Sequence, residues 1–102
     1  MQRFDTTSPE GFFDVLGGTD RSQAATMTLA PGRSTGGPRN AHRASDQWLY
    51  VVSGAGTATV EGERHRLRAG TLLLVEAGET HEIVNDGDEP LETVNVYAPP
   101  EY

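Results

Sequence analysis

The chain has 102 residues, enough for one domain with a modest core. Its formal net charge of −7 argues against nucleic acid and anionic membrane surfaces as partners. The absence of cysteine excludes disulfides, thiolate metal ligands and thiol nucleophiles, and because all eight basic residues are arginine, no lysine amine is available for Schiff-base chemistry.

Residues 1–21 are mixed and polar, with one apolar island at 12–16. We interpret them as an N-terminal arm, either flexible or forming an edge strand that packs on a neighbour or is exchanged between subunits. The start has no apolar run behind a basic segment, and no stretch approaches the roughly 20 apolar residues of a membrane-spanning helix. We therefore expect a soluble cytoplasmic protein whose main domain covers residues 22–102.

The main domain reads as a series of short strands separated by Gly- and Pro-rich turns. Apolar and polar residues alternate, or apolar residues run together, over 22–30, 47–53, 57–61, 64–68, 71–75, 80–85 and 91–97. The run at 71–75 is apolar on both faces and is expected to be covered on both sides. No window has a helical period, so the pattern predicts an all-β fold, a small double-sheet barrel.

Both faces of the strand at 47–53 carry large apolar side chains. Leu49 points with Gln47 to one side, whereas Trp48 and Tyr50 point to the other. One face lines the barrel interior, and the other meets either a second layer of the same chain or a partner subunit. We favour a homodimer, because closed two-fold dimers are the commonest oligomers.

Two blocks of the chain place histidines at fixed distances from glycines. In the first, five residues separate Gly36 from His42, and six residues separate Gln47 from Gly54. The second block, GTLLLVEAGETHEIVN, spans residues 70–85 and contains Gly70, Gly78, His81 and Asn85.

These blocks resemble the two motifs of the cupin superfamily, and the resemblance extends over about residues 24–98. In the second block only the family's proline is replaced, by Glu76. The resemblance implies a small single-domain cupin, and therefore a double-sheet jelly-roll barrel. The turn glycines are then structural, not chemical.

The resemblance also implies a metal site, but an incomplete one. The family holds its metal with two histidines and a glutamate from the first motif and a histidine from the second. His42 and His81 match, whereas Ala44 has no donor atom and Gln47 offers a neutral amide in place of a carboxylate. The predicted ligands are therefore His42, Gln47 and His81, for one divalent Fe, Mn, Ni or Zn ion or for none.

Three further polar residues are predicted to contact a substrate: Asn40, Asp46 and Asn85. Asp46 would share the side of His42 if the strand were regular there, and its charge would then compensate for the amide of Gln47. Asn40 would lie on the same side and add an oxygen.

Three functions are compatible with this site. The first is metal-dependent chemistry on a small molecule, with Gln47 or Asp46 completing a shell begun by His42 and His81. The alternative is a metal-poor module that binds a small polar ligand such as a sugar or an organic acid. A third is a stability or assembly role with a degenerate pocket. No catalytic residue is assigned, and no serine has a nucleophile-elbow setting.

Overall fold

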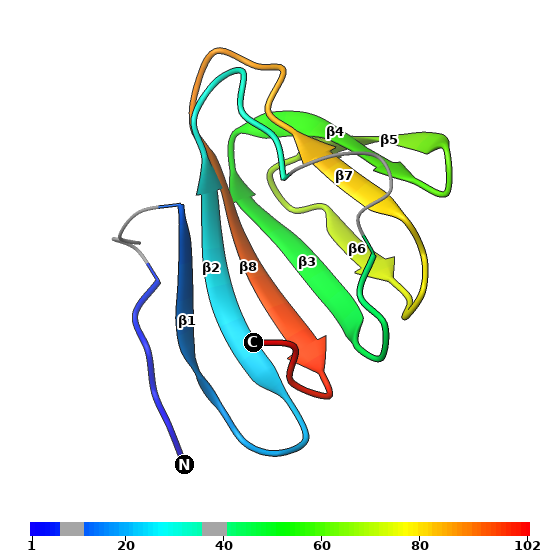
Figure 1. Ribbon diagram of the computed structural model, residues 1–102. Helices are drawn as coiled ribbons and strands as arrows, with labels where there is room; N and C mark the ends of the chain where they lie inside the picture. Colours follow the sequence, from blue (N-terminus) through cyan, green and yellow to red (C-terminus); the bar gives the residue numbers. More distant parts are fainter. Residues whose placement is uncertain (7–11, 36–40) are drawn as a thin grey trace.

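The computed structural model describes residues 1–6, 12–35 and 41–102, which form two antiparallel sheets (Figure 1). The eight strands of this part of the chain are β1 (Phe13–Gly18), β2 (Gln23–Leu29), β3 (Asp46–Ser53), β4 (Ala55–Val60), β5 (Glu63–Arg68), β6 (Leu72–Val75), β7 (His81–Val84) and β8 (Leu91–Ala98). The larger sheet has the order β1-β2-β8-β3-β6, and the smaller has the order β5-β4-β7. The predicted all-β double-sheet fold is confirmed.

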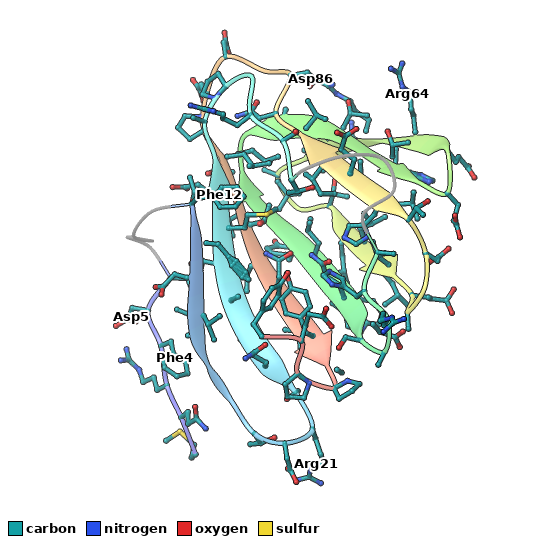
Figure 2. The ribbon with its side chains drawn as sticks, in the orientation of Figure 1. Phe4, Asp5, Phe12, Arg21, Arg64 and Asp86 are labelled. Atoms are coloured by element: carbon teal, nitrogen blue, oxygen red, sulfur yellow. The ribbon has the colours of Figure 1, made fainter. Side chains whose placement is uncertain are left out.

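The apolar island of the N-terminal arm forms β1, which lies at the edge of the larger sheet. It pairs with β2 of the same chain, with Phe13 opposite Met27. Residues 1–6 run beside β1, where Figure 2 labels Phe4 and Asp5. The side-chain amide of Gln2 donates a 2.8 Å hydrogen bond to the Gly18 carbonyl and ties this segment to the strand.

The interior of the barrel has an apolar end and a polar end. Aliphatic side chains fill the apolar end: Met27, Leu29, Leu49, Val51, Ala58, Leu67, Ile83 and Leu91. Each fully buried leucine or isoleucine stabilises the fold by about 1.5–3 kcal/mol. Toward the start of β3 and the end of β8 the inward positions become polar, and Gln47 lies opposite Tyr97. This polar end holds the candidate site.

Strand β6 differs from its prediction. Leu73 packs against the core and Val75 is buried, but Leu72 is 58% exposed on the opposite side. The prediction that both faces of this strand are covered is therefore wrong within a single chain. The reason is topological, since β6 is an edge strand whose outer side has no second layer from the described residues.

The outer side of β3 and β6 forms an exposed apolar surface, here called the outer apolar face: Trp48, Tyr50, Val52, Leu72 and Leu74. Trp48 pairs with Leu74 and Tyr50 with Leu72, so the side chains lie in adjacent rows across the two strands. All five are between 37% and 58% exposed. The predicted alternation along β3 is therefore confirmed.

The turn between β3 and β4 depends on Gly54. Its φ of +86° is unfavourable for other residues, and an added Cβ would collide with the backbone of Pro90. The prediction that Gly54 is a structural turn residue is confirmed.

The described residues contain no helix long and apolar enough to cross a membrane.

Candidate functional site

A cavity of about 310 Å³ opens between the two sheets at the polar end of the barrel. Its apolar wall consists of Phe12, Phe13, Met27, Ile83, Tyr97 and Tyr102, and its polar groups come from Ser34, Thr35, His42, Gln47 and His81. A mostly apolar cavity of this size, with polar groups gathered on part of its wall, is typical of small-molecule sites.

His42 lies before β3, in a segment held by the second motif and by the chain that follows β8. The backbone N–H of Gly78 donates a 2.7 Å hydrogen bond to the His42 carbonyl, and Gly78 has a φ of +86°. On the other side, the Ser45 hydroxyl donates a 2.6 Å hydrogen bond to the Pro99 carbonyl. The turn of the second block thus positions the histidine of the first.

His81 is the first residue of β7 and faces the ring of His42. The centroids of the two rings are 4.8 Å apart, and Nδ1 of His81 lies 3.3 Å from the Glu79 carbonyl. Burial lowers the pKa of His81, and the neighbouring His42 adds to the lowering. The neutral ring is favoured, with Nδ1 donating to Glu79 and Nε2 left as an acceptor.

A buried polar chain runs from His42 to the backbone of β2. Nε2 of His42 is 2.9 Å from Oε1 of Gln47, and the Gln47 amide donates a 2.9 Å bond to Oδ1 of Asn95. The Asn95 amide donates to the Thr93 hydroxyl, which donates to the Met27 carbonyl, both at 3.0 Å. We call these five residues the relay.

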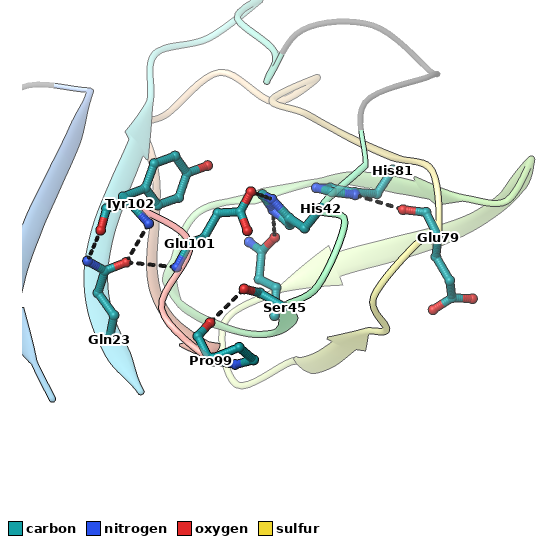
Figure 3. Close-up of polar contacts among 9 residues, drawn as sticks. Gln23, His42, Ser45, Glu79, His81, Pro99, Glu101 and Tyr102 are labelled. Carbon is teal, nitrogen blue, oxygen red and sulfur yellow. Dashed lines mark hydrogen bonds and ion pairs between the residues drawn. The ribbon is translucent and has the colours of Figure 1, made fainter. Parts of the chain in front are cut away.

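The other nitrogen of His42 meets the C-terminal segment, which folds back over the cavity (Figure 3). Nδ1 of His42 lies 3.2 Å from a carboxylate oxygen of Glu101. The Gln23 side chain holds this segment by donating to the Tyr102 carbonyl at 2.7 Å and accepting from the Tyr102 N–H at 2.9 Å. Both ring nitrogens of His42 are therefore engaged.

Two tyrosines close one side of the cavity. The Tyr102 ring lies 4.7 Å from that of Phe13 and 5.1 Å from that of Tyr97, measured between centroids, in edge-on arrangements. Burial raises the pKa of both tyrosines, and the neighbouring Tyr102 adds to the rise for Tyr97. The wall is therefore neutral and amphipathic.

Asp46 does not join the cavity. Its carboxylate accepts a 2.9 Å hydrogen bond from the Ala77 N–H. The expected alignment with His42 is not met, because residues 43 and 44 form a bend and the regular strand begins only at Asp46. Alternation from that point turns Gln47 inward and Asp46 outward.

Asn85 is fully buried, but it organises a loop and does not line the cavity. Its amide donates to the carbonyls of Leu29 and Glu89 at 2.8 and 2.7 Å, and its Oδ1 accepts from the Gly87 N–H at 2.9 Å. Every polar atom of the side chain is used by the backbone. Two other residues of interest, Asn40 and Gly36, lie outside the described residues.

The residues of the candidate metal site do not fit a metal as arranged here. Gln47 and His42 bond to each other through the atoms with which they would bind an ion. Within the described residues no three His, Asp or Glu side chains are grouped as metal ligands. Ala44, at the missing histidine position, is exposed.

Sequence reasoning missed Thr93, Asn95, Tyr97 and Glu101. A signal existed for the first three, since they occupy successive inward positions of β8 and carry polar groups where a purely structural strand would be apolar. For Glu101 there was none, because it follows a Pro-Pro step outside both motifs.

The family model for the cupin domain matches residues 25–97, so the chain belongs to the cupin family. The chain is 37% identical over 73 residues to the tetracenomycin polyketide synthase protein TcmJ of Streptomyces glaucescens, covering 72% of this chain and 48% of that protein. It is 32% identical over 72 residues to an oxalate-binding protein of Thermotoga maritima, covering 71% of this chain and 58% of that protein. The chain thus spans about half the length of these curated relatives.

A solved structure shares the whole architecture. BH2720 from Bacillus halodurans superimposes with a TM-score of 0.89 at 26% sequence identity, covering 95% of this chain and 76% of that one. The predicted cupin jelly roll is confirmed.

Proposed function

We propose that this cupin domain binds a small organic acid in its barrel cavity without a resident metal. The acid's carboxylate would lie against the rings of His42 and His81, and its carbon skeleton against the aromatic wall. One observation carries the proposal: a carboxylate, that of Glu101, already lies 3.2 Å from Nδ1 of His42. An imidazole and a carboxylate at this separation form a charge-assisted hydrogen bond when a proton lies between them.

The composition of the cavity supports the same ligand class. Phe13, Tyr97 and Tyr102 offer apolar contact area, whereas the two histidines concentrate polar groups nearby. Such a site suits a compact acid that directs one carboxylate at the histidines and packs the rest of its surface on the aromatic wall. The volume of about 310 Å³ restricts the ligand to a small molecule.

The names of the relatives point the same way. The Thermotoga maritima relative is named as an oxalate-binding protein, and oxalate is a small organic acid. The polyketide synthase protein adds a link to small-molecule metabolism. We extend the binding of a small organic acid to this chain as a proposal.

Metal-dependent chemistry, with His42, Gln47 and His81 as ligands, stays a prediction. The mutual bond of His42 and Gln47 weighs against it, because a bound ion would have to replace that bond. Asn40 likewise stays a predicted ligand contact. Asp46 and Asn85 are not proposed as contacts, because their side chains are bonded elsewhere.

Calorimetric titration of chelator-treated protein with matched ligand pairs tests the proposal. Benzoate and malonate are compared with benzamide and malonamide, which share their shape but lack the charge. The acids should bind at least about tenfold more tightly than the amides. Equal binding within each pair, no binding of any acid, or binding only after a metal is restored would contradict the proposal.

We also propose that two copies associate through the outer apolar face. The side chains of this surface carry no charge, and β8 extends it with the half-buried Val94 and Val96. Two copies packed patch to patch would bury no side-chain charge there, and a two-fold axis makes one such surface sufficient. Elsewhere the net charge of −7 disfavours close approach of two copies.

A further inference from the structure

We infer that Thr93 and Asn95 are positioning residues, which fix the orientation of the Gln47 amide and thereby decide which nitrogen of His42 carries the proton. Neither residue lines the cavity itself. Their influence on His42 passes through hydrogen bonds to Gln47. The side chains of Thr93, Asn95 and Gln47 are at most 3% exposed, so water does not compete for these bonds.

The direction of the relay follows from its fixed end. The Met27 carbonyl only accepts, so the Thr93 hydroxyl must donate to it. The hydroxyl oxygen then accepts from the amide group of Asn95, which turns the carbonyl of Asn95 toward Gln47.

The hydrogen-bond direction along the relay also fixes its end at His42. With its NH₂ donating to Asn95, Gln47 directs its carbonyl at Nε2 of His42 across 2.9 Å. A carbonyl cannot donate, so the hydrogen must reside on Nε2. Turning over either amide alone would place two donors or two acceptors face to face in a buried site.

Glu101 makes this assignment consequential. Its carboxylate faces Nδ1 of His42 and favours a hydrogen on that atom. A neutral ring has only one N–H, so Gln47 and Glu101 compete for it. The anchored relay decides this competition, and the hydrogen resides on Nε2. The role in binding rests on the proposed function: a ligand acid would bring the proton that lies between its carboxyl group and Nδ1, while the hydrogen on Nε2 stays bonded to Gln47.

Replacing the anchor should reverse the outcome. In Thr93→Val the Asn95 amide loses its acceptor, so both amides can turn over together and present the NH₂ of Gln47 to Nε2. The ring hydrogen then resides on Nδ1, which donates a hydrogen bond to the Glu101 carboxylate. Thr93→Ser keeps the hydroxyl and should keep the parent arrangement, which separates the hydrogen bond from the packing of the side chain.

The experiment is ¹⁵N NMR of the His42 ring in ligand-free full-length protein, at a pH where the ring is neutral. We expect hydrogen on Nε2 by at least about tenfold in the parent and in Thr93→Ser, and predominantly on Nδ1 in Thr93→Val. A parent with hydrogen on Nδ1, or a folded Thr93→Val that retains it on Nε2, would overturn the inference. If Thr93→Val does not fold, Asn95→Leu frees Gln47 in the same way, and the parent spectrum alone still tests the fixed tautomer. Failure to bind any acid would refute only the proposed function, because this measurement needs no ligand.

Discussion

The carboxylate of Glu101 lies 3.2 Å from Nδ1 of His42, which brings the end of the described chain into contact with the first histidine motif. The contact places a negative charge of the protein's own beside the two histidines. It also closes part of the cavity, since the neighbouring Tyr102 lines the wall. On our account, Glu101 occupies the position that the carboxylate of a ligand would take.

Glu101→Gln should therefore strengthen the binding of small organic acids. A tethered carboxylate competes with a free one at a local concentration of the order of millimolar, so its removal should raise affinity by about tenfold. Calorimetric titration with benzoate measures the change. Glu89→Gln removes an equal charge from an exposed loop position and should leave affinity unchanged. Weaker binding in Glu101→Gln would mean that Glu101 belongs to the binding site.

His81 should make stability depend on pH. Burial lowers its folded-state pKa below the ordinary 6.5, so between these two values the unfolded chain binds more protons than the folded one. Stability should fall as the pH decreases from 6.5 toward the folded-state pKa, and this fall should be smaller in His81→Gln.

Denaturant unfolding between pH 8 and pH 5 provides the measurement. His65→Gln is the control, since this histidine is 41% exposed on β5 and should leave the parental dependence intact. Equal pH dependence in the parent and in His81→Gln would contradict the assignment.

Asn85→Ala should reduce stability without changing ligand affinity. The substitution removes three hydrogen bonds and leaves the buried Leu29 carbonyl short of a partner, at a cost of about 2–4 kcal/mol. Chemical denaturation measures the loss, and benzoate titration of the folded variant measures affinity. A selective loss of affinity would restore Asn85 as a ligand contact.

Tyr50→Glu should dissociate the proposed dimer. It places a charge in the middle of the outer apolar face, where two copies would bury it. Sedimentation should change from dimer to monomer, whereas Thr59→Glu, on the other sheet, should leave the parental state. A monomeric parent, or a Tyr50→Glu protein that still sediments as a dimer, would refute this interface.

The fold was predictable because its signals are local. Strand alternation and turn residues such as Gly54 act within a few positions, and the spacing of His81 behind Gly78 belongs to one turn. The pairing of His42 with His81 across the cavity followed only from resemblance to a known family. Periodicity alone does not specify which strands of a barrel face one another.

The rest of the site depends on irregular backbone. The bend at residues 43 and 44 reverses the side on which Asp46 lies, and no sequence period announces such a bend. Glu101 reaches His42 because the chain folds back after β8 and is caught by Gln23. Asn95 was visible in principle, as a polar residue at an inward strand position.

The most direct test of the account is the metal content of the protein at the moment it binds an acid. Protein purified without a histidine tag is treated with chelator, checked by elemental analysis and titrated with benzoate and malonate in the same preparation. We predict saturable binding of acid by protein that contains no stoichiometric metal, and loss of that binding in His42→Ala. Binding that disappears with the metal and returns with Fe, Mn, Ni or Zn would contradict the account and restore His42, Gln47 and His81 as ligands.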